Sequence, residues 1–131
     1  MNRRDCLHTM SAMGLLSISH HQIMGSHEGA LKRSIPSSGE KLTAIGLGTW
    51  QTFDVPDSSA ERDPLKEVLK TLLSKGGRVV DSSPMYGASE EVVGDLSAEL
   101  NINDKLFMAT KVWTNGRENG IRQMNESFGL M

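Results

Sequence analysis

The sequence has few residues of the kinds that build disulfides and metal sites, and these lie near one end. Its single cysteine, Cys6, excludes an internal disulfide. All four histidines lie between residues 8 and 27, and their spacings with Cys6 match no closed zinc pattern. We therefore predict no metal site in this chain.

A strong charge imbalance and a long apolar run are also missing. The net charge of −2 over 131 residues argues against a nucleic-acid partner held by phosphate contacts. No stretch approaches the ~20 apolar residues that a membrane span needs. The apolar content of 37% with 13 glycines is typical of a globular chain. The length allows one domain at most, and we predict neither a nucleic-acid nor a membrane partner.

The first 30 residues are predicted to be a leader outside the folded domain, which then spans residues 31–131. Arg3 and Arg4 precede a mildly apolar stretch at residues 10–18, an order that resembles a twin-arginine export signal. The alternative is a disordered extension. The protein would be exported or periplasmic if the leader is used, and cytoplasmic otherwise.

A β-hairpin is predicted at the start of the domain. Residues 32–35 and 42–45 flank a cluster of turn residues at 36–40, in which Gly39 is free to take a positive φ. The next segment, G-L-G-T-W-Q at residues 46–51, is predicted to be a strand with glycines where something approaches the backbone closely. Its two glycines are weak evidence for a dinucleotide-binding loop, since the third glycine of that fingerprint would fall at Gln51.

Alternating strand and helix patterns follow. A polar loop is expected at residues 53–62, and Asp63 is predicted to cap a first helix. Residues 79–81 and 106–112 are predicted strands, and Ser89 is predicted to cap a second helix. Apolar residues at helical spacing mark the inner faces of three helices: Leu65, Val68, Leu69, Leu72 and Leu73; Val92, Val93, Leu96 and Leu100; Ile121, Met124 and Phe128. This alternation implies an α/β fold with right-handed crossovers between parallel strands.

Two charged residues are expected at neighbouring strand ends. Asp81 ends one predicted strand and Lys111 lies at the end of the next, so that an ion pair is feasible across one strand spacing. Tyr86, on the intervening loop, would reach the same ammonium. A nearby ammonium stabilises the phenolate and makes the phenol a usable proton donor, while Asp81 would hold the lysine charged and oriented. The three residues are therefore predicted to protonate a developing alkoxide.

Each of the three residues has an ordinary structural explanation when taken alone. Lys111 alone is a solvated strand-end lysine, Tyr86 packs its ring on a loop, and Asp81 caps a turn. Only their combination at adjacent strand ends favours chemistry. A short-chain reductase, with lysine four residues after the tyrosine, is excluded because that position is Glu90.

Three segments closely resemble the aldo-keto reductases. They are G-L-G-T-W at residues 46–50, D-S-S-P-M-Y-G-A-S-E at 81–90 and T-K-V at 110–112, and the leading hairpin also resembles that family's. The resemblance covers residues 32–131. It implies a (β/α)8 TIM barrel that moves a hydride from NADPH to a carbonyl. This chain would supply a partial barrel, consisting of the hairpin and the first three βα units.

The resemblance also implies roles for particular residues. Asp81, Tyr86 and Lys111 match three members of the family's catalytic tetrad, with Tyr86 as the acid. Residues matching those that bind the nicotinamide end of the cofactor are Gly48, Thr49, Trp50 and Asp81. The substrate would be a small carbonyl compound whose identity the sequence does not give.

The fourth member of that tetrad is a histidine at the end of strand four, and no histidine follows His27. A complete barrel needs about 250 residues and eight strands. We therefore expect a truncated reductase that is inactive as an isolated chain. Two alternatives remain open: a fragment complemented by a chain that supplies the missing strands, or a non-catalytic module whose open edge strand pairs with a partner.

Overall fold

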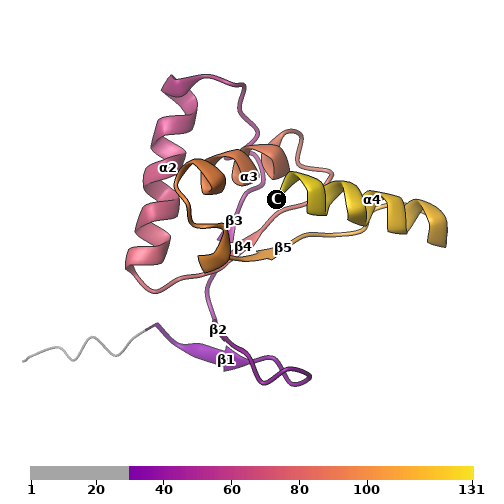
Figure 1. The fold of residues 1–131 in the computed structure, drawn as a ribbon, viewed down its shortest axis with the longest axis horizontal. Helices are drawn as coiled ribbons and strands as arrows, with labels where there is room; N and C mark the ends of the chain where they lie inside the picture. The colour runs from indigo at the N-terminus through magenta and orange to yellow at the C-terminus, as the bar shows by residue number, and fades with distance from the viewer. Residues whose placement is uncertain (1–29) are drawn as a thin grey trace, which may run out of the picture.

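The computed structural model describes residues 30–131 (Figure 1). The predicted leader, residues 1–30, lies outside them except for its last residue. The elements are β1 (Lys32–Ser34), β2 (Lys41–Thr43), β3 (Leu47–Gly48), α2 (Ser59–Ser74), β4 (Val79–Asp81), α3 (Ser89–Glu99), the 3₁₀ helix η1 (Asn103–Lys105), β5 (Phe107–Ala109) and α4 (Arg117–Leu130).

The predicted hairpin is confirmed. Strands β1 and β2 pair antiparallel, with Lys32 opposite Thr43. Gly39 lies in the connecting turn with φ +73°, a conformation that glycine adopts without steric cost. The hairpin lies apart from the other strands, below them in Figure 1.

The second sheet consists of three parallel strands in the order β3-β4-β5. Val80 pairs with Leu47 on one side and with Met108 on the other, so β4 is the central strand. A helix follows each strand, and α3 packs against both α2 and α4 (Figure 1). The predicted α/β fold with parallel crossovers is thus confirmed, as an open sheet without a closed barrel in the part of the chain that the structure describes.

The hydrophobic core lies between this sheet and the helices. Its buried members are Phe53, Leu69, Val80, Val92, Val93, Leu96, Ile102 and Leu106. The predicted inner face of α3 is largely confirmed, since Val92, Val93 and Leu96 are almost fully buried. Phe53 corrects the prediction of a polar loop at residues 53–62: its ring is 1% exposed, because the loop after β3 folds back over the core.

Helix α2 begins earlier than predicted. Its first residue is Ser59 and its N-cap is Ser58, so Asp63 does not cap it and Pro64 lies inside the helix. A proline there removes one backbone hydrogen bond. Arg62 fixes this turn from outside, because its guanidinium contacts Asp95 of α3 at 2.8 Å. Ser58 followed by Glu61 is a capping signature that would have marked this start, although no side-chain cap bond forms.

Helix α3 begins at Ser89, and its N-cap is Ala88, not Ser89 as predicted. The Ser89 hydroxyl donates instead to the Thr49 carbonyl oxygen, at 3.4 Å. That bond ties the start of α3 to the segment that follows β3.

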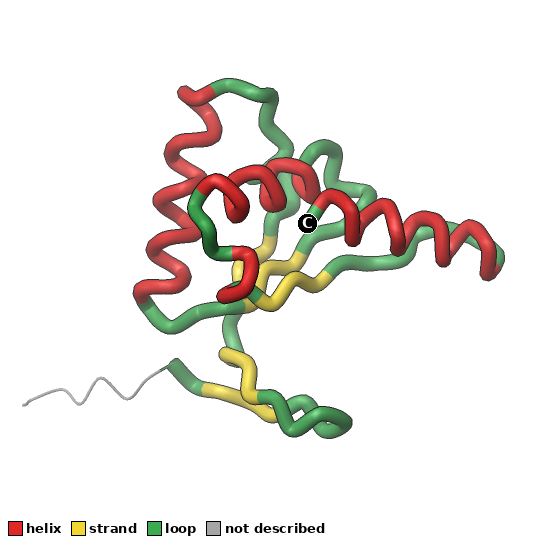
Figure 2. The backbone as a smooth tube through the Cα atoms, viewed as in Figure 1, coloured by secondary structure: helices red, strands yellow, loops and turns green. Residues whose placement is uncertain are grey.

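Strand β5 is shorter than the predicted strand at residues 106–112. It ends at Ala109, and Figure 2 shows the long loop that leads from it to α4. Lys111 therefore lies two residues beyond the strand.

Helix α4 also differs from its prediction. Ile121 and Phe128 are 43% and 67% exposed, and Ser127 is its buried residue. Val68 of α2, predicted to face inward, is 39% exposed as well. Among the described residues, no helix combines the length and the apolar character that crossing a membrane requires.

Candidate active site

Asp81, Lys111 and Tyr86 meet at the carboxyl ends of β4 and β5. The Lys111 ammonium donates to Asp81 Oδ2 at 2.8 Å and to the Ser82 carbonyl oxygen at 2.7 Å. The predicted ion pair is therefore confirmed. Because 49% of the Asp81 side chain is exposed, solvent screens the pair, and its main effect is to orient the ammonium.

Tyr86 lies beside that ammonium. Lys111 Nζ is 4.8 Å from the centre of the Tyr86 ring. The ring of Trp50 also lies near Tyr86, with its centre 6.4 Å from that of the Tyr86 ring and the two planes tilted by 40°. These side chains, together with Ser83, Met85 and Trp113, line a cleft of about 430 Å³.

The pKa of Lys111 is raised above its usual value of 10.5. Partial burial, the largest single influence, lowers this pKa, but the combined attraction of Asp81 and Tyr86 outweighs it. The ammonium thus stays charged up to the pH range in which phenols ionise, near ~10.

The four predicted cofactor contacts occupy three kinds of environment. Asp81 is bound to Lys111, as described above. A Cβ atom added to Gly48 would meet nothing within 4 Å, so this strand end is open, and Trp50 is 64% exposed at the cleft. The Thr49 side chain is buried, and its hydroxyl lies 2.9 Å from Ser82 Oγ and 3.2 Å from the Asp81 carbonyl oxygen. Gly46, by contrast, has the close backbone approach that the sequence predicted, since an added Cβ would lie 2.9 Å from Val79 Cβ.

The loop that carries Tyr86 is braced from the segment after β3. Asp54 Oδ1 accepts a hydrogen bond from the Ala88 amide at 2.9 Å. Gly87 has φ +58°, and a Cβ there would lie 2.2 Å from Asp54 Oδ1, so a larger residue would not fit against the brace. Asp54 was not predicted as a site residue, since its only signal in the sequence is that of a polar residue in a loop.

Replacing Asp54 with alanine is expected to lower the free energy of unfolding by about 0.5–1.5 kcal/mol, the usual contribution of one hydrogen bond. The measurement is urea unfolding of the 131-residue chain. Asp57→Ala is a matched control, because that side chain is 91% exposed and its one ion pair within residues 30–131 is with Arg62, at 3.4 Å. If both variants lost the same free energy of unfolding, the hydrogen bond between Asp54 and Ala88 would not be a specific support of the Tyr86 loop.

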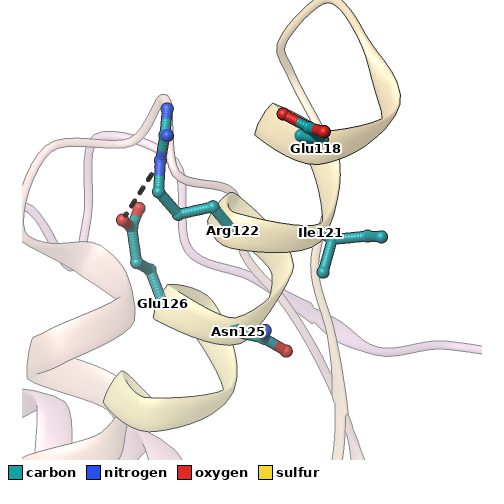
Figure 3. A pocket seen from close by; sticks show the side chains of 5 residues that line it. All are labelled: Glu118, Ile121, Arg122, Asn125 and Glu126. Atoms are coloured by element: carbon teal, nitrogen blue, oxygen red, sulfur yellow. Dashed lines mark ion pairs between the residues drawn. The ribbon is translucent and has the colours of Figure 1, made fainter.

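A second hollow, of about 560 Å³, lies along α4 and is lined by Glu118, Ile121, Arg122, Asn125 and Glu126 (Figure 3). All five come from one helix, and Arg122 forms a loose 3.9 Å contact with Glu126. This hollow contains none of the residues predicted to act. Within residues 30–131, no group of three histidine, cysteine or acidic side chains is placed to hold a metal ion.

Comparison with known proteins identifies the family. The sequence profile of the Aldo/keto reductase family matches residues 44–128, and the chain belongs to that family. An aldo-keto reductase of Bacillus subtilis is 32% identical over 89 residues, 64% of this chain and 27% of the relative. The NADP-dependent D-sorbitol-6-phosphate dehydrogenase of Malus domestica is 37% identical over 82 residues, 59% of this chain and 24% of the relative. The chain thus spans about a quarter of the length of these curated relatives.

Solved structures agree with this assignment. A thermostable aldo-keto reductase in complex with the inhibitor epalrestat superposes with a TM-score of 0.62 at 28% identity, covering 76% of this chain and 38% of that one. An aldo-keto reductase of Klebsiella pneumoniae in complex with NADPH gives a TM-score of 0.52 at 27% identity, covering 72% and 36%. The chain is therefore a member of a (β/α)8-barrel family of oxidoreductases that use nicotinamide cofactors.

Proposed function

We propose that this chain carries the proton-donating centre of an NADPH-dependent carbonyl reductase, with Tyr86 as the acid. The observation that supports this most directly is the position of the Lys111 ammonium, which is bonded to Asp81 and lies 4.8 Å from the centre of the Tyr86 ring. A positive charge beside a phenol stabilises the phenolate that forms when the proton leaves.

In this mechanism each side chain has one task. When bound, NADPH supplies the hydride that reaches the carbonyl carbon. The Tyr86 phenol donates its proton to the carbonyl oxygen, which becomes the alcohol, and the resulting phenolate takes a proton back from solvent. Lys111 stabilises that phenolate, and Asp81 holds the ammonium toward the ring.

The residues at the end of β3 fit a cofactor at this site. The space in front of Gly48 is open, and the exposed Trp50 ring offers a flat apolar surface beside Tyr86. Thr49 would act indirectly, by holding Ser82 in place, because its hydroxyl is already hydrogen-bonded to the Ser82 hydroxyl. We propose NADPH as the cofactor because two relatives, the sorbitol-6-phosphate dehydrogenase and a Saccharomyces cerevisiae glycerol 2-dehydrogenase, are named for NADP and the Klebsiella structure contains NADPH. The substrate is proposed to be a small carbonyl compound.

The Tyr86–Lys111 pairing is testable without turnover, because Tyr86 is the only tyrosine in the chain. Tyrosinate absorbance therefore reports the ionisation of this one phenol. Replacing Lys111 with methionine removes the positive charge that stabilises the phenolate, so tyrosinate absorbance should appear at higher pH in the variant than in the wild type.

Lys70→Met is the matched control, since the Lys70 ammonium pairs with Glu67 on α2 and lines no part of the cleft. Its titration midpoint should equal that of the wild type. An unchanged midpoint in a folded Lys111→Met variant would refute the proposed role of Lys111.

A second candidate is association with a polypeptide that supplies further barrel strands. Apolar side chains on the loop after β5 and on α4 favour it: Val112, Trp113, Ile121 and Phe128 are between 43% and 67% exposed. The test mixes the purified chain with the part of the Bacillus subtilis relative that follows its matched segment. A stable complex that consumes NADPH with an aldehyde would support association, and two separate species in light scattering would oppose it.

A further inference from the structure

Glu90 has a buried carboxylate that the proposed mechanism does not use. The residue is 3% exposed and lies in the first turn of α3. Burying a carboxylate is costly unless it is well hydrogen-bonded. The ion pairs formed by residues 30–131 include none with Glu90, so its burial depends on hydroxyl partners and on the N-terminal end of the helix.

Two hydroxyl groups donate to this carboxylate from different elements. Thr110 Oγ1 donates to Glu90 Oε1, and Ser127 Oγ of α4 donates to Glu90 Oε2 at 3.1 Å. Glu90 therefore joins α3, the segment after β5 and α4 at one buried point.

The Thr110 bond lies where the backbone is otherwise weakly held. The ladder between β4 and β5 ends at Ala109, whose carbonyl accepts from the Ser82 amide at 2.8 Å. Within residues 30–131, no backbone hydrogen bond joins Thr110 or Lys111 to another segment. The position of Lys111 is thus left to side-chain contacts: the bonds of its own ammonium to Asp81 and to the Ser82 carbonyl oxygen, and the neighbouring Thr110–Glu90 bond, whose acceptor residue is 3% exposed.

The same bond connects the two segments that carry the acid and the ammonium. Tyr86 precedes Glu90 by four residues, with only residues 87–89 between them, and Lys111 directly follows Thr110. A bond from Glu90 to Thr110 therefore limits how far the phenol and the ammonium can separate.

We propose that Glu90 is a positioning residue that sets the distance between Tyr86 and Lys111 through its hydrogen bond with Thr110. This inference rests on the proposed function, because it assigns a purpose to the Tyr86–Lys111 pairing. The competing explanation is that Glu90 only anchors α4 through Ser127. The two bonds are on different carboxylate oxygens, so they can be removed one at a time.

The experiment compares Thr110→Val with Ser127→Ala in the 131-residue chain. Each variant deletes one hydroxyl from Glu90, and urea unfolding records the stability of each. The first readout is the tyrosinate titration of Tyr86. The second is the titration of the Lys111 side chain by NMR of its ε-carbon, assigned by the loss of that signal in Lys111→Arg.

If Glu90 positions the pair, Thr110→Val should move the tyrosinate midpoint upward, in the direction of Lys111→Met but by less. It should also lower the pKa of Lys111 toward the usual value, because the ammonium is no longer held against Asp81. Ser127→Ala should leave both titrations unchanged even if it costs stability. Thr110→Ser, which restores the hydroxyl, should behave like the wild type.

Equal shifts in Thr110→Val and Ser127→Ala would overturn the inference, as would an unchanged pair of titrations in folded Thr110→Val. If Thr110→Val does not fold, Glu90→Gln serves in its place, because it keeps the shape of the side chain and one carbonyl acceptor, and a smaller shift in the same direction is expected. If the tyrosinate midpoint did not move in Lys111→Met, the proposed function would be refuted, but the inference about Glu90 would not. The lysine titration in Thr110→Val would still decide whether Glu90 positions Lys111.

Discussion

Replacing Tyr86 with phenylalanine is expected to lower the rate of NADPH-dependent carbonyl reduction by about 10²–10⁴-fold, the usual contribution of a positioned general acid. The substitution removes the hydroxyl and keeps the ring, so the 6.4 Å contact with Trp50 should persist. The loss should therefore appear in the chemical step and not in cofactor binding. The measurement is NADPH consumption with an aromatic aldehyde at saturating concentrations, for the complemented chain of the second candidate function, since we expect the isolated chain to be inactive.

Cofactor binding provides the internal control. Both tryptophans of the chain line the cleft, so their fluorescence is sensitive to a ligand that binds there. NADPH should quench it to the same extent, and with the same affinity, in the wild type and in Tyr86→Phe. A loss of less than about tenfold in rate, with binding intact, would mean that another group donates the proton.

The sequence predicted the ion pair between Asp81 and Lys111 better than it predicted the backbone setting of the two residues. Asp81 and Lys111 form the expected ion pair, because any two neighbouring parallel strands bring their carboxyl ends together. Strand β5, however, ends at Ala109, so Lys111 reaches Asp81 from a loop. The run of residues at 106–112 has strand propensity throughout, and propensity alone does not show where a neighbouring strand stops pairing.

The tertiary contacts of α4 could not be predicted from the sequence, for a different reason. Periodicity marked Ile121 and Phe128 as the inner face of α4, yet Ser127 is the residue that is buried there. Its burial follows from the hydrogen bond to Glu90, a partner that is 37 residues away in the sequence. Helical spacing contains no information about such a partner, nor about the Thr110 hydroxyl that shares the carboxylate.

Helices α3 and α4 approach each other closely at Gly94, and replacing this glycine is the second change for which we expect a large effect. A Cβ atom on Gly94 would lie 1.7 Å from the Leu130 carbonyl oxygen and 3.3 Å from Met131 Cα. Both are backbone atoms that cannot move without shifting the end of α4. Gly94→Ala should therefore lower the free energy of unfolding by about 1–3 kcal/mol, the usual cost of overpacking, as measured by urea unfolding.

Gly129→Ala is the matched control and should have the opposite sign. It makes the same substitution in α4, where an added Cβ would meet nothing within 4 Å and alanine favours the helix by up to roughly 1 kcal/mol. Losses of similar size at both positions would show that the close approach at Gly94 is not what matters.

Gly94→Ala also distinguishes between the two hydrogen bonds of Glu90. A displaced α4 loosens the bond from Ser127 and leaves the bond from Thr110 in place. The tyrosinate titration of Gly94→Ala should therefore match that of the wild type, although the variant is less stable.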